Sequence, residues 1–139
     1  MKKTGLLNAP VSHAIARMGH TDGLVVCDSG LPFPPDPSRI DLAVVPGVPS
    51  FLQVVEAVGR ELQVERALIA AELPDRNPTV FDALTALLDR IAQAQGAPIV
   101  VDRIPHEDFK ARTATAKAIV RTGECSPYAN VILYSGVIF

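Results

Sequence analysis

Cysteine is scarce in this sequence, and its scarcity bears on where the protein works. The two cysteines, Cys27 and Cys125, lie far apart in the chain and form no CxxC pair. Isolated cysteines of this kind make no disulfide framework and are typical of a reducing cytoplasm. Each is therefore expected to be a buried small side chain rather than a reactive thiol.

Two other absences exclude classes of partner. The chain has a net charge of −2 and no run of lysine or arginine, whereas binding to nucleic acid needs clustered basic side chains. Its apolar runs are far shorter than the ~20 residues that span a bilayer, and residues 1–19 lack the continuous apolar segment of a secretion signal. We therefore expect no nucleic acid and no membrane as partner, and a cytoplasmic location.

The motifs of nucleotide sites and metal sites are also missing. No GxGxxG, GxxxxGK[ST] or GxSxG pattern occurs in the chain. The three histidines, His13, His20 and His106, do not have the spacing of metal ligands. The sequence thus predicts no metal and no cofactor, and it leaves acid–base groups acting on a small polar molecule as the candidate chemistry.

The sequence does contain a regular alternation of helix and strand patterns. Apolar residues recur at helical spacing over 9–18, 51–62 and 78–95, and a short helix is expected after Pro105. Strands are predicted at 24–27, 41–45, 67–73, 98–104, 118–120 and 130–139, and the proline-rich segment 31–38 is predicted to be an extended loop. This alternation predicts an α/β fold with a single domain over residues 1–139, in which helices flank a mostly parallel central sheet.

Local signals support the helix boundaries. Ser50 and Gln53 have the spacing of a capping box, while Asn77 with the proline after it marks a helix start and Gly96 a helix stop. The composition adds a different expectation. Hydrophobic residues make up 48% of the chain, which is high for a domain of this size, so part of the surface is expected to be covered by subunit contacts.

His20 follows Gly19, which is expected to end the first helix. Two interpretations fit this position. A cation just past a helix C-terminus interacts well with the last carbonyls, and an imidazole is also the side chain best suited to carry a proton near neutrality. Thr21 or Asp22 could orient the ring in the second case.

Asp28 ends the buried strand at 24–27 and precedes a Ser-Gly pair. Ligands of open α/β sheets bind beyond the carboxyl ends of the strands, where a carboxylate can accept hydrogen bonds from sugar hydroxyls. The alternative is a loop-capping Asx turn. Both interpretations stay open on the sequence alone.

Three polar side chains further along the chain are weaker candidates. His106 lies in the first turn of a short helix and could simply be exposed. Tyr128 and Asn130 bring a hydroxyl and a carboxamide together in the turn-rich segment before the last strand. That segment could equally be a polar connector.

Taken together, several ungapped motifs give the chain a family resemblance. The stretches are "MKKTGLLN", "GHTD", "VVCDSGLP", "RIDLA", "GVPSF", "GECSPYANVIL" and the terminal "GVIF". In this order they resemble the D-ribose pyranase (ribose mutarotase) family, which is related to the fucose mutarotases. The resemblance covers the full length of the chain, although Ser29 stands where an alanine is usual in the family.

The resemblance implies an isomerase that interconverts β-D-ribopyranose and β-D-ribofuranose in ribose catabolism. It implies that His20 is the proton donor, and that Asp28, His106, Tyr128, Ala129 and Asn130 contact the sugar. It also implies a ring-based homodecamer in the cytoplasm, with sites near subunit contacts. Two other activities stay open: a mutarotase of another sugar such as fucose, and a non-catalytic sugar-binding subunit linked to ribose transport. The general base is likewise open between His106, Tyr128 and a bound water.

Overall fold

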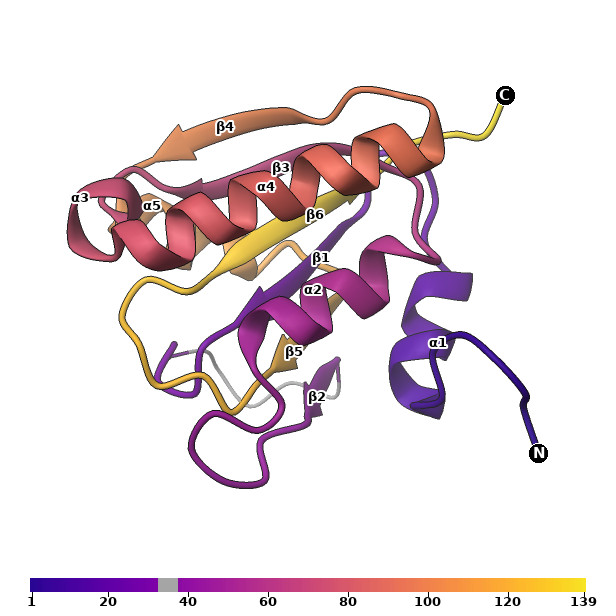
Figure 1. Cartoon of the computed structure of the whole chain (residues 1–139), viewed down its shortest axis with the longest axis horizontal. Coiled ribbons are helices and arrows are strands. Elements are labelled where there is room, and N and C mark those ends of the chain that lie inside the picture. The colour runs from indigo at the N-terminus through magenta and orange to yellow at the C-terminus, as the bar shows by residue number, and fades with distance from the viewer. Residues whose placement is uncertain (33–37) are drawn as a thin grey trace.

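The chain folds around one mixed sheet, which the computed structural model describes for residues 1–32 and 38–139. The strands are β1 (Gly23–Cys27), β2 (Arg39–Asp41), β3 (Val64–Ala70), β4 (Val100–Ile104), β5 (Ala118–Arg121) and β6 (Val131–Ser135). The helices are α1 (Ala9–Ala16), α2 (Phe51–Gly59), α3 (Leu73–Arg76), α4 (Pro78–Gln95) and α5 (His106–Thr113). The predicted α/β layered fold with a mostly parallel sheet is confirmed (Figure 1).

The strand order is β2-β5-β1-β6-β3-β4. β1 pairs with β5, β5 with β2 and β3 with β4, all in parallel, whereas β6 runs antiparallel to both β1 and β3. Five strands therefore point the same way, and the chain's last strand is inserted between them in the opposite direction. As a result, the start of β6 lies at the same edge of the sheet as the carboxyl ends of the other strands.

Helices cover both faces of the sheet, which explains the continuous apolar run of β1. All five of its residues are buried, and neighbouring side chains point to opposite faces. Leu24 and Val26 pack with the apolar sides of α2 and α4, which lie in front of the sheet in Figure 1. Val25 and Cys27 pack instead with Phe109 of α5 on the other face.

The predicted helix signals are confirmed at α2 and α4. Ser50 and Gln53 form the reciprocal capping box at the start of α2. The side chain of Asn77 accepts the backbone N–H of Val80 at the start of α4, and Gly96 ends α4 with φ 71°. A positive φ favours glycine, so this residue type suits the helix terminus.

Several element boundaries differ from the prediction. The strand expected at 41–45 is wrong, because the hydrogen-bonded strand is Arg39–Asp41 and the apolar residues after it form a turn closed by a Val45–Val48 bridge. The strand expected at 67–73 begins and ends earlier, since the chain leaves the sheet at Ala71 and enters α3. The last strand stops at Ser135. Most of the loop predicted at 31–38 lies outside the described residues.

Candidate active site

A polar pocket lies at the sheet edge where the carboxyl ends of β1, β4 and β5 meet the start of β6. It has a volume of about 420 Å³, which suits a small molecule. Three of the residues predicted from the sequence line it, namely Asp28, His106 and Tyr128. The other lining residues are Ser29, Gly30, Leu31, Pro32, Glu124, Cys125, Ser126 and Pro127.

Asp28 is held in place from two sides. Its Oδ1 accepts the backbone N–H of Gly30 at 2.9 Å, so the Asx turn, the alternative interpretation of this residue, is present. Its Oδ2 accepts Nδ2 of Asn130 at 2.8 Å, and the backbone N–H of Asp28 donates to Oδ1 of Asn130 at 3.0 Å. Asn130 is fully buried, so its role here is to orient the carboxylate of Asp28 at the pocket.

The loop before β6 is fixed by side-chain hydrogen bonds, some from outside the loop and some within it. Asn77 donates through Nδ2 to Oγ of Ser126 at 3.0 Å and to the carbonyl oxygen of Pro127 at 2.9 Å. Glu124 accepts both the backbone N–H and the hydroxyl of Ser126 through Oε1. Tyr128 follows with φ 61°, a left-handed conformation that costs energy for a residue other than glycine. The phenol ring is thus presented by a tightly held turn.

His106 lies against Tyr128 at the start of α5. The two ring centroids are 4.9 Å apart, with the rings nearly perpendicular. Nδ1 of His106 is buried and makes no hydrogen bond with the described residues. The backbone N–H of His106 donates to both carboxylate oxygens of Glu72, at 3.1 and 3.0 Å, and this bond lowers the pKa of Glu72. Glu72 therefore anchors the helix start that carries the imidazole.

Arg121, the last residue of β5, forms an ion pair beside the pocket. Arg121 donates through Nε to the carbonyl oxygen of Ser29 at 3.0 Å and through its guanidinium to both carboxylate oxygens of Asp41, at 3.1 and 3.0 Å. Arg39 also contacts Asp41, at 3.4 Å. These bonds tie the residues after Asp28 to the edge strand β2.

The two cysteines have different surroundings. Cys27 is buried below the pocket, and burial together with the neighbouring Asp28 raises the pKa of its thiol to about 12. Cys125 is exposed in the pocket wall, with Sγ 3.6 Å from Oγ of Ser29. The expectation that both cysteines are buried is therefore wrong for Cys125, because the turn-rich loop turns it toward solvent.

His20 does not reach this pocket. His20 precedes β1 and Asp28 follows β1. The two ends of this five-residue strand are roughly 16 Å apart. Nε2 of His20 lies 2.8 Å from Oε2 of Glu65, near the start of β3. The ring partner is thus Glu65 rather than Thr21 or Asp22. Asp22 instead accepts the backbone N–H of Gly19.

Ala129 is also absent from the pocket lining. The whole residue is buried and packs in the main core. Sequence reasoning did not single out Glu65, Glu72 or Asn77, although all three hold predicted site residues or their loop. Neither Glu65 nor Glu72 belongs to a motif, and Asn77 was assigned only as a helix cap.

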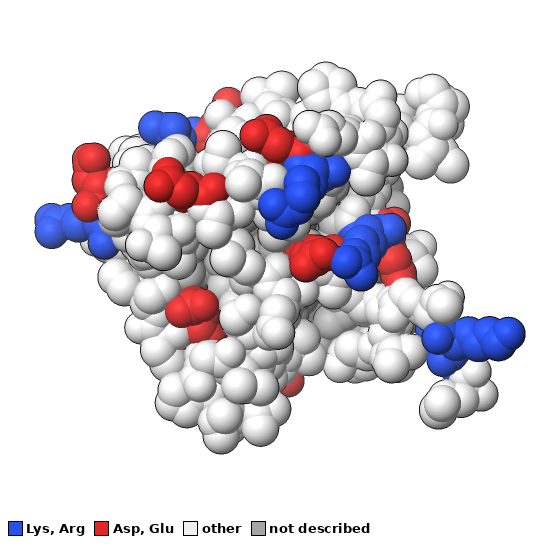
Figure 2. Space-filling view, in the orientation of Figure 1, with Lys and Arg blue, Asp and Glu red and all other residues white. Residues whose placement is uncertain are grey.

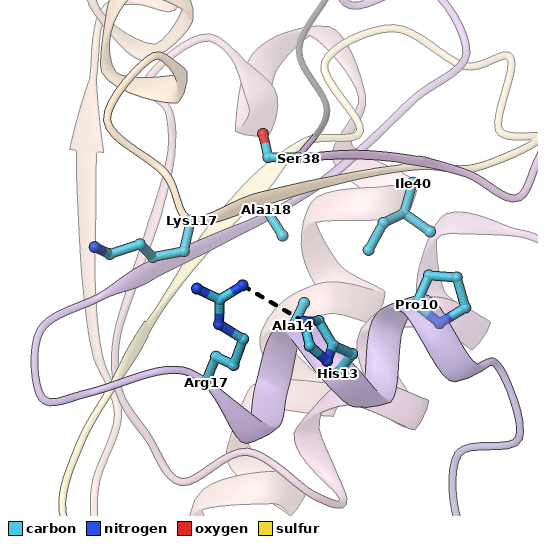
Figure 3. Close-up of a pocket in the computed structure, with 8 residues that line it drawn as sticks. All are labelled: Pro10, His13, Ala14, Arg17, Ser38, Ile40, Lys117 and Ala118. Atoms are coloured by element: carbon cyan, nitrogen blue, oxygen red, sulfur yellow. Dashed lines mark hydrogen bonds between the residues drawn. The ribbon is translucent and has the colours of Figure 1, made fainter.

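A second hollow, of about 460 Å³, lies between α1 and the start of β5 (Figure 3). His13, Arg17 and Lys117 line it, together with apolar side chains. Arg17 lies 3.5 Å from Nε2 of His13, and the amino group of Lys117 lies 3.6 Å from Asp22. None of the predicted site residues lines this hollow, so the polar pocket at Asp28 is the candidate active site.

In residues 1–32 and 38–139, no three histidine, cysteine, aspartate or glutamate side chains come together as metal ligands would. No helix in the same part of the chain has the length and hydrophobicity needed to cross a bilayer.

The fold and the pocket define a small α/β protein whose pocket is lined by carboxylate, imidazole and phenol groups. Residues 1–138 match the model of the RbsD / FucU transport protein family. The chain belongs to this family.

Individual relatives cover the whole chain. It is 56% identical to a D-ribose pyranase of Haemophilus influenzae and 55% identical to one of Actinobacillus pleuropneumoniae, each over 100% of both chains. Among solved structures, RbsD of Bacillus subtilis complexed with D-ribose is 39% identical, with a TM-score of 0.89 and 100% of both chains covered. A fucose mutarotase of Streptococcus pneumoniae shares the fold at 22% identity, with a TM-score of 0.70 and coverage of 96% of this chain and 95% of the other.

Proposed function

We propose that the chain is a D-ribose pyranase, an isomerase that interconverts the pyranose and furanose forms of D-ribose in ribose catabolism. The observation that carries the proposal is the pocket at Asp28, His106 and Tyr128 in a chain 56% identical, over its full length, to a D-ribose pyranase. A 39% identical relative was solved with D-ribose bound. We further propose that the protein works in the cytoplasm.

Changing the ring size of ribose needs two proton transfers. The ring oxygen must gain a proton as its bond to the anomeric carbon breaks, and the anomeric hydroxyl must lose one as the open-chain aldehyde forms. Closure through a different hydroxyl reverses these transfers. Positioned acid and base groups contribute about 10²- to 10⁴-fold to steps of this kind.

The pocket offers suitable contacts for the sugar. Each carboxylate oxygen of Asp28 accepts one hydrogen bond within the chain, and a carboxylate has room for about four. Sugar hydroxyls can occupy the remaining positions. His106 and Tyr128 stand beside Asp28 and can bind further hydroxyls or receive the second proton. Asn130 acts through Asp28.

His20 is the group proposed to donate the first proton, and it must come from a second copy of the chain. His20 and Asp28 lie at opposite ends of β1, too far apart to act on one pentose. The imidazole is half-exposed and lies at the surface, where a neighbouring copy can meet it. A complete site then combines His20 of one subunit with Asp28, His106 and Tyr128 of the next.

The surface carries apolar segments next to both half-sites. The C-terminal residues Val137, Ile138 and Phe139 are exposed. They follow Gly136, whose N–H donates to the carbonyl oxygen of Gln63, near the end of the sheet where His20 lies. Val44, Val45 and Val48 are exposed on the turn that binds Gly123, beside the pocket. In Figure 2 the C-terminal tail at the upper right and the lobe at the bottom, where this turn lies in Figure 1, are almost free of charged side chains.

We propose that these two apolar segments meet between neighbouring copies. A contact between two different patches is heterologous, and such contacts generate closed rings when the rotation allows it. This arrangement agrees with the ring-based homodecamer that the family resemblance implies.

Ribose exchange in saturation-transfer NMR tests the function. The protein is expected to transfer saturation between the anomeric signals of ribopyranose and ribofuranose. Ribose binding without exchange would support a non-catalytic sugar-binding subunit instead. Faster exchange with fucose than with ribose would support a mutarotase of a different sugar.

Mixing two inactive variants tests the shared site. His20→Ala and Asp28→Asn are each expected to lose exchange activity. If they are dissociated, mixed in equal amounts and reassembled, about a quarter of the sites regain both groups, because each site takes one group from each neighbour. Mixed assemblies that form, as seen by native mass spectrometry, yet stay inactive would contradict the shared site.

A further inference from the structure

Glu65 and His20 form a pair that the fold itself does not need. Nε2 of His20 lies 2.8 Å from Oε2 of Glu65, and the two side chains are 53% and 41% exposed. Exposed pairs of this kind contribute little to the stability of a fold. Neither partner packs in the two hydrophobic core clusters among the described residues.

The backbone around Glu65 is irregular in a way that aims its side chain. Val64 pairs with Ser135 and Arg66 with Tyr134, so two steps along β3 match one step along β6 and Glu65 is the extra residue. This is a β-bulge, which redirects a side chain and is frequent beside active sites. The bulge turns Glu65 toward the end of the sheet where His20 lies.

The turn that carries His20 is also fixed. Thr21 has φ 67°, and its N–H donates to the carbonyl oxygen of Ser135 at 2.8 Å. Ser135 in turn donates its N–H to the carbonyl oxygen of Asp22 at 2.9 Å. The end of β6 therefore touches both the histidine turn and the bulge.

Gly136 leaves room for the glutamate. A Cβ atom at this position would lie 3.1 Å from Cβ of Glu65 and 3.5 Å from its Oε2. The first contact is tighter than ordinary van der Waals distances, so a side chain here would crowd the Cβ of Glu65. The fold thus provides an aimed glutamate, a fixed histidine turn and room for the Glu65 side chain beside Gly136.

We propose that Glu65 is a positioning residue for His20, an inference that rests on the proposed function. The carboxylate accepts the N–H at Nε2 and thereby directs Nδ1 toward the sugar in the neighbouring subunit's pocket. A carboxylate behind an imidazole fixes the tautomer and orientation of the ring in the same way in other acid–base sites.

The proton balance follows from this geometry. With both ring nitrogens protonated, His20 gives the Nδ1 proton to the ring oxygen as the bond from that oxygen to the anomeric carbon breaks. The proton of the anomeric hydroxyl passes to a base in the pocket, which yields the open-chain aldehyde. The neutral imidazole keeps its proton at Nε2, so the hydrogen bond to Glu65 persists and the ring stays in place for closure.

Two variants of Glu65 and one control test the proposal. Glu65→Ala removes the acceptor, whereas Glu65→Gln keeps a neutral acceptor oxygen. Asp102→Asn is the matched control, because Asp102 of β4 makes an exposed ion pair, at 3.7 Å, with Arg66, the residue after Glu65 in β3, and forms no hydrogen bond or ion pair with His20. Ribose exchange kinetics are measured for all three, together with the ¹⁵N signals of the His20 ring, identified by their loss in His20→Ala.

The expected results separate positioning from a structural role. Glu65→Ala should lower kcat roughly 10- to 100-fold with KM within about twofold, and His20 should change from the Nε2–H tautomer to a mixture. Glu65→Gln should keep the tautomer and lose less activity, and Asp102→Asn should match the wild type. A Glu65→Ala variant with wild-type kcat, or with an unchanged His20 tautomer, would overturn the proposal. Absence of exchange in the wild type would instead refute the proposed function.

Discussion

Asn130 and Asp28 are joined by two hydrogen bonds that use both ends of the carboxamide. Nδ2 of Asn130 donates to the Asp28 carboxylate at 2.8 Å, while Oδ1 accepts the Asp28 backbone N–H at 3.0 Å. Only one orientation of the carboxamide satisfies both bonds. The position of the pocket carboxylate is thus set by a residue that follows it by 102 positions in the chain.

Replacing this carboxamide by a carboxylate should damage both stability and activity. Asn130→Asp loses the donor to Asp28 and places a second negative charge in a buried position beside it. We expect the free energy of unfolding at pH 7 to fall by about 1–3 kcal/mol, together with a loss of ribose exchange. Urea denaturation measures the first effect. Asn8→Asp is the control, because Asn8 caps α1 through its oxygen, which aspartate retains. Equal stability of the two variants would contradict the expectation.

The two thiols should react very differently. Burial keeps the pKa of Cys27 at about 12, so its thiolate is scarce at pH 8, whereas Cys125 is exposed in the pocket wall. A thiol reagent such as dithiobisnitrobenzoate should modify one cysteine per native chain and both after unfolding. D-Ribose should slow the native reaction, since Cys125 lines the same pocket as Asp28. Rapid loss of both thiols in the native protein would contradict this description of Cys27.

Glu72 should make stability depend on acid pH. The backbone N–H of His106 lowers the pKa of this carboxyl in the folded chain below its ordinary value of 4.5. A lowered folded pKa contributes stability that is present above the unfolded value and is lost as pH falls through the folded value. The wild type should therefore exceed Glu72→Gln in stability by more at pH 7 than at pH 3, as measured by urea unfolding. A difference that grows toward pH 3 would contradict the assignment.

Gly123 should not tolerate a side chain. A Cβ atom there would lie 2.5 to 2.6 Å from backbone atoms of Val45 and Val48, which cannot move without displacing their turn. We expect Gly123→Ala to lower the free energy of unfolding by about 1–3 kcal/mol and to weaken subunit assembly. Thermal unfolding and light scattering measure these effects. Gly19→Ala is the control, because a Cβ at Gly19 meets only Asp22 at an ordinary 3.7 Å.

The sequence predicted the fold well where local signals are strong. The capping box at Ser50 and the helix start at Asn77 depend on residues a few positions apart, and the structure has both. The apolar run at 42–45 misled the strand prediction, because its valines lie exposed on a turn. The antiparallel direction of β6 depends on long-range pairing, which no local pattern encodes.

The same distinction applies to the candidate site. Asp28, His106 and Tyr128 were predicted separately and meet in one pocket, because the carboxyl ends of parallel strands share an edge. His20 is only eight positions from Asp28 in the sequence, and the family resemblance assigned both to the sugar site. Five of the residues between them form strand β1, so the two residues lie at opposite ends of this strand. The orientation of Glu65 toward His20 depends on a β-bulge, which no sequence pattern indicates.

The position of His20 and Asp28 at opposite ends of β1 has a consequence for how activity arises. One folded chain carries two half-sites that face away from each other, so under the proposed assembly folding and the onset of catalysis are separate events. An open row of copies would leave one unmatched half-site at each end. A closed ring leaves none. Ring closure therefore completes every active site and also buries apolar surface. Specific activity should accordingly fall on dilution before any secondary structure is lost.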